Sequence, residues 1–353
     1  MDGLSKEGSG AMKVIDLRSD TVTLPTPEMR EAMKNAELGD DVFGEDPTVI
    51  KLEAMAAEKL GKEAALLVSS GTQGNLVSIL THCQRGDEVV LGDLCHTYRY
   101  EAGAVSAFGG VHVYTVPSDA RGRLDPAAVE QAIRPDNVHF PRTGLICMEN
   151  THNLCGGATL GPEDMAPVAQ VAARHGLPMH LDGARIFNAS VALGMEAKDL
   201  AEPFSSLSFC LSKGLSCPVG SIVCGSEEFI RNARRVRKAL GGGMRQAGII
   251  AAAGIVALET MIDRLAEDHA MARLLAEGLA EVPGIRVDLE RVQTNMVMVQ
   301  VEKEVQNGVV AALAERNVKV LDRGGGRLRL VTHRGIEDGD IGQAIEAFGE
   351  VMK

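Results

Sequence analysis

The chain has 353 residues, 45% of them hydrophobic, which predicts one large and one smaller domain with ample material for a core. Its formal net charge of −12 argues against nucleic acid as a partner, because a phosphate backbone binds basic surfaces. No apolar run is long enough to span a membrane, and residues 1–11 lack the apolar region of a secretory signal.

The seven cysteines indicate a reducing compartment. Their number is odd, none forms a CxxC pair, and several lie in apolar runs. We therefore expect reduced core thiols in a cytoplasmic protein. Residues 1–13 are expected to form a disordered extension, within which Met12 is a candidate natural start.

Strands alternate with helices after an N-terminal arm. Pro27 is placed to begin a helix, and Asp46 is a candidate N-cap for a helix that ends at Leu60. The strands expected next are Ala64–Val68, Glu88–Leu91, Val111–Val116, Thr143–Glu149, Leu177–Asp182, Ser206–Leu211 and Ser221–Gly225. The helices expected among them open at Leu76 or cover Pro126–Ile133, Pro162–His175, Glu227–Leu240 and Ala247–Leu258. This alternation predicts an α/β domain over residues 14–264, with a doubly wound, mostly parallel sheet.

The pattern changes after about residue 265 and predicts a small C-terminal α+β domain over residues 265–353. An alanine-rich helix is expected first and another helix last. The elements expected between them are strands Ile285–Leu289, Met296–Val301, Val318–Leu321 and Arg327–Val331, with a helix over Val309–Arg316.

A glycine-rich turn follows the first strand of the large domain. The run Ser69-Ser-Gly71-Thr72-Gln-Gly74 lies between this strand and the start of a helix. Free N–H groups and the positive end of the helix dipole make such a turn a phosphate-binding site. The alternative is an ordinary strand-to-helix turn with no ligand.

A lysine and an aspartate each end an apolar, strand-like run. Lys213 follows such a run and precedes Gly214, whereas Asp182 ends His180-Leu-Asp. Their spacing fits one helical excursion between parallel strands. A partly desolvated lysine amine is a nucleophile for carbonyls. The pair therefore predicts a pyridoxal phosphate site, with Lys213 holding the aldehyde as a Schiff base and Asp182 pairing with the pyridinium nitrogen.

Eight motifs in order, from about Val14 to the C-terminus, together resemble the low-specificity L-threonine aldolases. They are Asp16-Leu-Arg-Ser-Asp-Thr-Val-Thr23, Gly39-Asp-Asp-Val-Phe-Gly-Glu-Asp-Pro47, Ser70-Gly-Thr-Gln-Gly-Asn75, Glu149-Asn-Thr-His-Asn153, His180-Leu-Asp-Gly-Ala-Arg185, Ser212-Lys-Gly-Leu215, Gly241-Gly-Gly-Met-Arg-Gln246 and Arg329-Leu-Val-Thr-His333. The resemblance implies an aspartate-aminotransferase-like fold (fold type I), pyridoxal 5'-phosphate as cofactor and a homotetramer. It also implies cleavage of β-hydroxy-α-amino acids to glycine and an aldehyde. Phe43 departs from the family, where many members carry tyrosine.

The same resemblance implies roles for cofactor-binding residues. It makes Lys213 the Schiff-base lysine and Asp182 the pyridinium partner, and it places Gly71 and Thr72 at the phosphate. His96 resembles the histidine that stacks on the cofactor ring. Two more basic residues, Lys238 and Arg245, resemble contacts to the phosphate or to a neighbouring subunit.

Further residues are implied to bind or act on the substrate. Arg329 resembles the main clamp for the substrate carboxylate, with Ser19 as a hydroxyl donor to it. Arg185 resembles a contact to that carboxylate and to the cofactor hydroxyl. His139 matches a family histidine discussed as an acid or base, and we expect His96 and His139 to serve different threonine isomers.

Some residues, and the function itself, have competing interpretations. Asp20 has a simple alternative as a turn residue, and His152 and Asn153 are expected to order the loop at a strand end. His180 and Asp182 lie on one strand face, but no third ligand is spaced to join them, so no metal site is predicted. The first rival is another pyridoxal enzyme, a β-eliminating lyase or an aminotransferase. The second is a non-catalytic nucleotide-binding or regulatory module.

Overall fold

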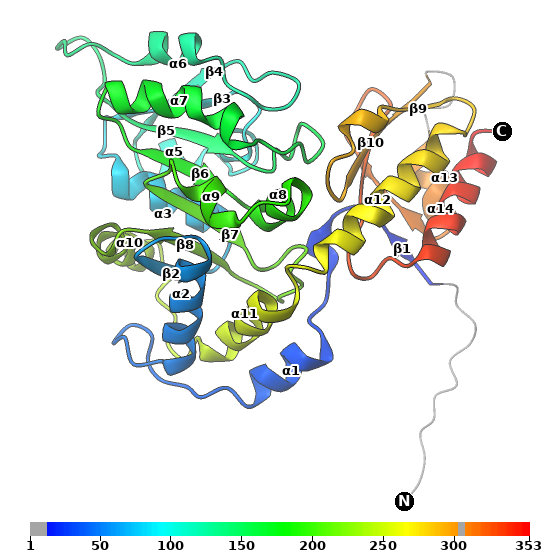
Figure 1. The fold of residues 1–353 in the computed structure, drawn as a ribbon, viewed down its shortest axis with the longest axis horizontal. Helices are drawn as coiled ribbons and strands as arrows, with labels where there is room; N and C mark the ends of the chain where they lie inside the picture. The colour runs from blue at the N-terminus through cyan, green and yellow to red at the C-terminus, as the bar shows by residue number, and fades with distance from the viewer. Residues whose placement is uncertain (1–12, 303–307) are drawn as a thin grey trace, which may run out of the picture.

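The computed structural model describes residues 13–302 and 308–353, which form a large and a small domain (Figure 1). The extension predicted over residues 1–13 lies outside the described residues except for Lys13. That residue is held in place, because its Nζ donates to Asp340 Oδ2 at 2.6 Å.

The large domain is built on a seven-stranded sheet with the order β2-β8-β7-β6-β5-β3-β4. Neighbouring strands are parallel except β8, which runs antiparallel to both β2 and β7. Every residue of β3, β5, β6, β7 and β8 is buried, as expected for strands covered on both faces. The strands are β2 (Ala64–Val68), β3 (Glu88–Gly92), β4 (His112–Val116), β5 (Thr143–Glu149), β6 (Met179–Asp182), β7 (Ser206–Cys210) and β8 (Ser221–Gly225).

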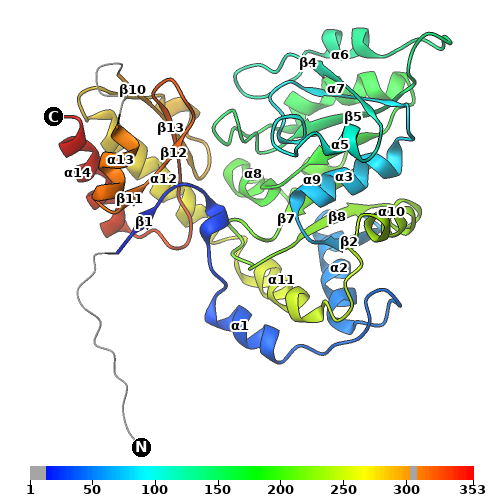
Figure 2. The same cartoon turned by 180° about the vertical axis from the view of Figure 1, so that it is seen from behind.

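Helices cover both faces of this sheet, which confirms the doubly wound prediction. Helices α7 and α8 lie on one face, whereas α3, α5 and α10 lie on the other (Figures 1 and 2). The helices of the large domain are α1 (Pro27–Lys34), α2 (Pro47–Lys59), α3 (Gly71–His82), α4 (His96–Arg99), α5 (Ala104–Ala107), α6 (Pro126–Ala132), α7 (Pro162–Arg174), α8 (Ile186–Leu193), α9 (Ala197–Ala201), α10 (Glu227–Ala239) and α11 (Gly248–Thr260).

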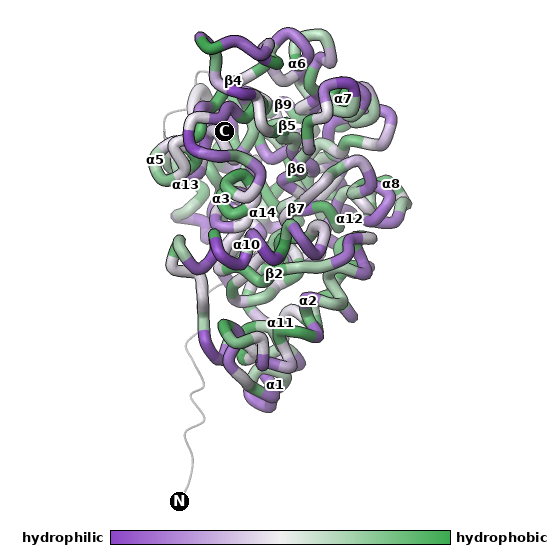
Figure 3. Tube along the Cα trace, turned by 90° about the vertical axis from the view of Figure 1, so that its left-hand side faces the viewer, coloured by the Kyte–Doolittle hydropathy of each residue, from purple (hydrophilic) through white to green (hydrophobic). Residues whose placement is uncertain are grey.

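The hydropathy of a helix reflects how much of its surface is buried. Helix α10 is hydrophilic along much of its length, whereas α11 is hydrophobic (Figure 3). The reason is that α11 packs against both α1 and α2, while α10 covers the sheet with one face only. None of the helices in the described residues combines the length and apolar character needed to cross a bilayer.

The small domain is an antiparallel sheet covered by helices, as predicted. Its strand order is β12-β13-β10-β9, and a separate pair joins β1 to β11. Its strands are β1 (Ile15–Asp16), β9 (Ile285–Val287), β10 (Met296–Val301), β11 (Val318–Lys319), β12 (Leu321–Asp322) and β13 (Arg327–Val331). Its helices are α12 (Leu265–Ala280), α13 (Val309–Glu315) and α14 (Asp338–Val351), with 3-10 turns over Asp20–Val22 and Leu289–Arg291.

The start of the N-terminal arm belongs to the small domain, whereas the sequence grouped the arm with the large one. Strand β1 runs parallel to β11, and Ile15 and Leu17 are buried in the small-domain core. Leu17 also accepts a hydrogen bond from Val331 N at 2.8 Å. The chain then crosses to α1 on the large domain (Figure 2). Asp20 lies where the two domains meet, because its carboxylate accepts from Arg185 of the large domain and from Asn295 of the small one.

Candidate active site

A cavity of about 130 Å³ lies where the carboxyl ends of the central strands meet the small domain. Ligands of open α/β sheets bind at this edge. Six separate parts of the chain contribute to its wall. The lining residues are Ser19, Thr21, His96, Glu149, Thr151, Asn153, Asp182, Ala184, Arg185, Lys213 and Arg329.

Lys213 enters this cavity from the turn that follows β7. Its carbonyl oxygen accepts hydrogen bonds from Thr23 Oγ1 at 2.9 Å and from Ser216 N at 2.8 Å, which fix the backbone. The side chain is half-buried, and Nζ has no hydrogen-bond or ion-pair partner among the described residues. The amine is therefore available to a ligand.

Asp182 is the last residue of β6 and is buried at the cavity wall. Its Oδ2 accepts from Asn75 Nδ2 at 2.8 Å, and its Oδ1 accepts from Ala184 N at 3.1 Å. These bonds hold the carboxylate in one orientation. His180, two residues earlier, lies behind Asn75 in the same network, because its ring nitrogens lie 2.9 Å from Ser206 Oγ and 3.2 Å from Asn75 Oδ1.

The glycine-rich turn opens α3 at Gly71, five residues before the start that the sequence predicted. Ser70 caps the helix by accepting from Gln73 N at 3.2 Å and from Gly74 N at 2.9 Å. The N–H groups of Gly71 and Thr72 precede the first intrahelical bond. A Cβ at Gly71 would lie 2.8 Å from Cys210 Sγ, so this close approach requires glycine.

His96 begins α4 and faces the cavity. Its backbone N–H donates to Glu149 Oε2 at 2.6 Å, and its Nδ1 lies 3.0 Å from Glu101 Oε1. Burial opposes protonation of the ring, but the hydrogen bond to Glu101 and the charges of Asp182 and Glu149 outweigh it and raise the pKa of His96.

Asp20 corrects an expectation, because it is a fully buried ion-pair partner and more than a turn residue. Its carboxylate accepts from Arg185 Nε at 2.7 Å and from Arg185 Nη2 at 2.6 Å. Burial alone would raise the pKa of Asp20, but the Arg185 guanidinium overrides this effect and holds that pKa well below its usual range. Arg185 thus reaches the cavity with its charge already balanced.

Arg329 reaches the cavity from β13 with neutral partners only. Its Nη1 donates to Asn153 Oδ1 at 2.6 Å and its Nη2 to the Arg18 carbonyl at 3.0 Å, while Nε is buried without a partner. No carboxylate of the described residues pairs with it. Burial, together with nearby Arg185 and Arg323, lowers the pKa of Arg329 to about 10. A buried guanidinium of this kind is suited to bind an anionic ligand.

Five predicted site residues do not line this cavity, namely Gly71 and Thr72 at the start of α3 and three exposed basic residues. His139 is exposed on the loop before β5, where its N–H donates to Asn137 Oδ1. Lys238 is exposed at the end of α10, and Arg245 pairs with Asp40 at 3.0 Å. The Arg245 guanidinium lies over the ring of Phe43, 5.7 Å from its centroid. Their roles stay predictions.

Other residues of the site were missed as functional residues. Glu149, Glu101 and Asn75 are buried and hold His96 and Asp182 in place, yet none was assigned a role from sequence. The signal for Glu149 was its position at the end of a predicted strand. Asn153 orders the loop, because its N–H donates to Glu149 Oε1 at 2.8 Å. Its Oδ1 also accepts a hydrogen bond from Arg329.

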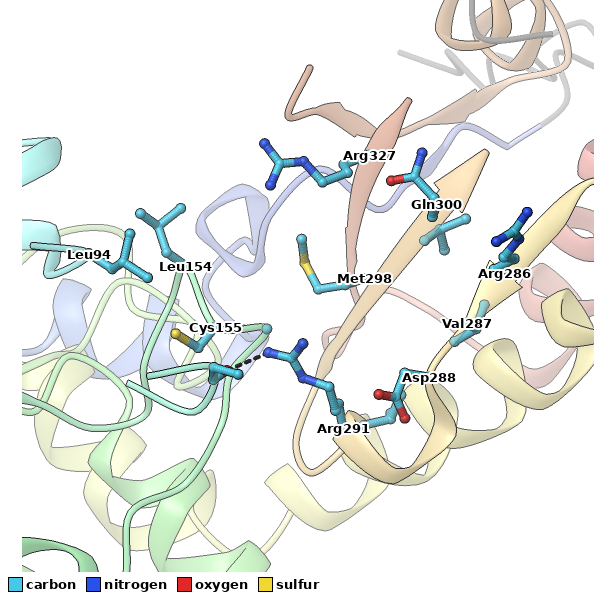
Figure 4. Close-up of a pocket in the computed structure, with 14 residues that line it drawn as sticks. Leu94, Leu154, Cys155, Arg286, Val287, Asp288, Arg291, Met298, Gln300 and Arg327 are labelled. Atoms are coloured by element: carbon cyan, nitrogen blue, oxygen red, sulfur yellow. Dashed lines mark hydrogen bonds between the residues drawn. The ribbon is translucent and has the colours of Figure 1, made fainter. Parts of the chain in front are cut away.

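A larger cavity of about 510 Å³ lies beside this site, between the loops after β3 and β5 and the small-domain sheet (Figure 4). Its wall combines Leu94, Leu154 and Met298 with the guanidinium groups of Arg291 and Arg327. It contains neither Lys213 nor Asp182. The chemistry therefore centres on the smaller cavity.

Known proteins are similar to this chain over nearly its whole length. The family model described as beta-eliminating lyase matches residues 16–304. Low-specificity L-threonine aldolase 1 of Arabidopsis thaliana is 47% identical over 347 residues, which cover 97% of each chain. A threonine aldolase structure from Leishmania major aligns with a TM-score of 0.82 at 21% identity, over 96% of this chain and 100% of that one.

The wider fold group is represented by a structure of SPT with PLP, which aligns with a TM-score of 0.74 at 18% identity. That alignment covers 96% of this chain and 87% of the other. These likenesses confirm the predicted fold type I architecture. The length, identity and order of the matched residues show that the chain belongs to the low-specificity L-threonine aldolase family, within the beta-eliminating lyases.

Proposed function

We propose that the chain cleaves L-threonine, L-allo-threonine and related β-hydroxy-α-amino acids to glycine and an aldehyde, with pyridoxal 5'-phosphate as cofactor. Arg329 carries the proposal, because its buried and unpaired charge faces the same cavity as Lys213 and Asp182. When bound, pyridoxal phosphate supplies a ring that accepts the electrons of the breaking Cα–Cβ bond. Relatives named as threonine aldolases over nearly the whole chain favour this activity over β-elimination or transamination.

The residues of the cavity fit the cofactor. Lys213 Nζ is the amine that would bind its aldehyde carbon, and Asp182 is the carboxylate that would pair with its protonated ring nitrogen. The N–H groups of Gly71 and Thr72 at the start of α3 would hold the phosphate, where the helix dipole favours negative charge. A non-catalytic nucleotide-binding module would need neither Lys213 nor Asp182.

The substrate carboxylate is assigned to Arg329, with help from Ser19 and Arg185. The planar guanidinium of Arg329 matches a carboxylate in two hydrogen bonds. Arg185 uses Nε and Nη2 on Asp20, which leaves Nη1 for a ligand. Ser19 Oγ accepts from Thr21 N at 3.3 Å and donates to Asp20 Oδ1 at 3.5 Å, a long bond that a substrate carboxylate would replace. Together these groups would set which Cα bond is aligned for cleavage.

A base must take the β-hydroxyl proton, and His96 and His139 are the candidates. His96 lines the cavity, whereas His139 is exposed on its loop. Loss of a general base typically slows a reaction about 10²–10⁴-fold. We expect His96→Phe to shift the threonine to allo-threonine ratio of kcat/KM, and His139→Phe to shift it the opposite way. Equal slowing of both isomers by both variants would exclude the two-histidine assignment.

The Lys213→Ala variant tests the proposed function. It should lose the visible absorbance of the bound cofactor and nearly all glycine production from threonine, because the amine both anchors the cofactor and releases product. Lys51→Ala, which removes an exposed lysine of α2, is the matched control and should behave like the wild type. Keto acid and ammonia as products, in place of glycine and acetaldehyde, would support the rival pyridoxal chemistries.

The assembly and the compartment are further parts of the proposal. We infer a homotetramer in which Lys238 and Arg245 contact the cofactor phosphate or the interface of a neighbouring chain. Support comes from their exposure and from Phe43, whose side chain is 72% exposed beside Arg245. Sedimentation of the holoenzyme tests the tetramer. A cytoplasmic location is supported by the seven cysteines, which are all free and buried.

A further inference from the structure

A continuous hydrogen-bonded chain joins the cavity histidine to the cofactor-facing aspartate. His96 Nδ1 lies 3.0 Å from Glu101 Oε1, and Asn75 Nδ2 donates to the same Glu101 oxygen at 2.8 Å. Asn75 Nδ2 also donates to Asp182 Oδ2 at 2.8 Å. One amide group thus bridges two buried carboxylates, one of which holds His96.

The two carboxylates determine the orientation of the bridging amide. Nδ2 with its two protons must face Glu101 and Asp182, which leaves Oδ1 to accept from Ser208 Oγ at 2.8 Å. Asn75 and Glu101 are 1% and 2% exposed, so bulk water does not compete for these bonds. Glu101 Oε1 therefore acts as an acceptor.

An accepting Oε1 determines the tautomer of His96. The ring nitrogen beside it, Nδ1, must carry the proton, which makes Nε2 the basic nitrogen of the neutral ring. Nε2 has no partner among the described residues, and the His96 side chain lines the cavity. A second shell that orients a histidine in this way is the usual device for making it a directed base.

We propose that Glu101 is a positioning residue, which holds His96 with Nδ1–H toward Glu101 so that Nε2 accepts the β-hydroxyl proton of the substrate. The inference rests on the proposed retro-aldol function. As the O–H bond breaks, an N–H bond forms at Nε2 and the O–H electron pair becomes the second C–O bond of the aldehyde. The Cα–Cβ bond breaks at the same time, and its electron pair stays with the Cα fragment that becomes glycine. The imidazolium is stabilised by the Glu101 carboxylate.

Charged groups face His96 from every side of the cavity. Glu101 follows α4, the helix that begins at His96, whereas Glu149 ends β5 and Asp182 ends β6. The ring of Tyr100 packs against the His96 ring, with the two centroids 5.6 Å apart. The cationic groups that share the cavity are Lys213, Arg185 and Arg329. Removal of the Glu101 charge takes away the nearest stabiliser of the imidazolium and lowers the pKa of His96.

A metal ion is the competing explanation for this cluster. Ligand atoms of His96, Glu101 and Asp182 lie within 4.8 Å of one another, which suits a divalent cation. However, Asn75 Nδ2 directs its protons at Glu101 and Asp182, so the positive ends of its N–H dipoles occupy the approach to both. Turnover that is lost with a chelator and restored by a divalent ion would overturn the positioning role.

The test compares Glu101→Gln with Glu130→Gln, an exposed carboxylate on α6 that pairs with Arg174 at 2.8 Å. We expect Glu101→Gln holoenzyme to lower kcat for threonine at least about tenfold, with KM nearly unchanged. Because His96 must be neutral to act, the acidic limb of its pH–rate profile should move to lower pH. Glu130→Gln should change neither. An unchanged limb for Glu101→Gln, or a loss confined to KM, would overturn the proposal.

A readout independent of turnover separates this inference from the proposed function. Nitrogen NMR of the cofactor-free protein should show His96 protonated at Nδ1 in the wild type, and should show a mixture or a lower pKa in Glu101→Gln. If the wild type makes no glycine from threonine, the proposed function fails while the tautomer result still stands or falls separately. If Glu101→Gln does not fold, the wild-type tautomer decides, and protonation at Nε2 would refute the positioning role.

Discussion

Two arginines reach the same cavity, but their surroundings differ. Arg185 comes from the large domain and is neutralised by Asp20 of the N-terminal arm, through two hydrogen bonds. Arg329 comes from the small domain and is held by the Asn153 amide and the Arg18 carbonyl, which orient it without balancing its charge. The difference indicates that Arg185 is largely part of the framework and that Arg329 is the group prepared for an incoming carboxylate.

Asp20→Asn should have the largest effect, because it leaves the Arg185 charge buried and uncompensated. Breaking one partner of a buried pair costs about 3–5 kcal/mol of the free energy of unfolding. Urea denaturation of the holoenzyme measures the change. Asp16→Asn on the same arm is the matched control, since its pair with exposed Arg18 should contribute under about 1 kcal/mol. Equal stability of Asp20→Asn and wild type would break the contrast between the arginines.

Arg329→Ala should come next, and it should act on substrate binding. Loss of a buried charge-assisted pair with the carboxylate costs about 2–5 kcal/mol, which raises KM for threonine at least about 30-fold. Cofactor affinity should stay near wild type, because the proposed phosphate site is at α3. Arg327→Ala, on the same strand but exposed, should leave KM unchanged. A loss of cofactor affinity without a change in KM would contradict this role.

Asn153→Ala should have a smaller effect, because it removes the orientation of Arg329 and keeps its charge. A hydrogen bond to a charged group is worth about 1.5–3 kcal/mol. We expect a rise in KM below that of Arg329→Ala, and no further rise when Asn153→Ala is added to Arg329→Ala. Additive effects in this double-mutant cycle would show that Asn153 acts separately from the guanidinium.

Lowering the pH should change the free energy of unfolding least per pH unit. The pH at which stability is lost distinguishes the Asp20–Arg185 ion pair from the buried histidines. Burial lowers the pKa of His82 to about 4 and that of His180 to about 3. The unfolded chain binds more protons on these rings between pH 6.5 and about 4, so stability falls as the pH drops through this window, by up to about 1.4 kcal/mol per pH unit for each histidine.

The Asp20 pair behaves differently in the same titration. Because the pKa of Asp20 is depressed in the folded state, its contribution is fully present above its usual pKa of 3.8 and is lost only as the pH falls below that value. Urea midpoints at pH 7, 5 and 4 should therefore fall in wild type and in Asp20→Asn by similar amounts. His82→Gln should flatten the slope. A slope that disappears in Asp20→Asn would show that the pair titrates in this window.

Local sequence patterns predicted the strands of the large sheet but missed or misplaced some helices. Strands β5 and β8 have the predicted bounds, because each is a largely apolar run whose two ends are marked by polar or glycine residues. Helix α3 begins earlier than predicted, since glycines normally weaken a helix start. Here Gly71 and Gly74 are required by the contacts of α3 with Cys210 and Ser208 on β7. Helices α8 and α9 were not predicted.

The sequence by itself determined the fold class and the residues that carry the proposed chemistry, Lys213, Asp182, His96 and Arg329. Lys213, Asp182 and His96 end or follow a predicted strand, Arg329 lies within one, and the eight motifs identified their family. Only the tertiary structure decided which charges are balanced. Asp20 meets Arg185 across 165 positions and Asn75 meets Asp182 across 107, and no local pattern encodes such distant pairs. Burial then decides how strong these interactions are, because a charge removed from water is stabilised only by the few partners that the fold brings to it.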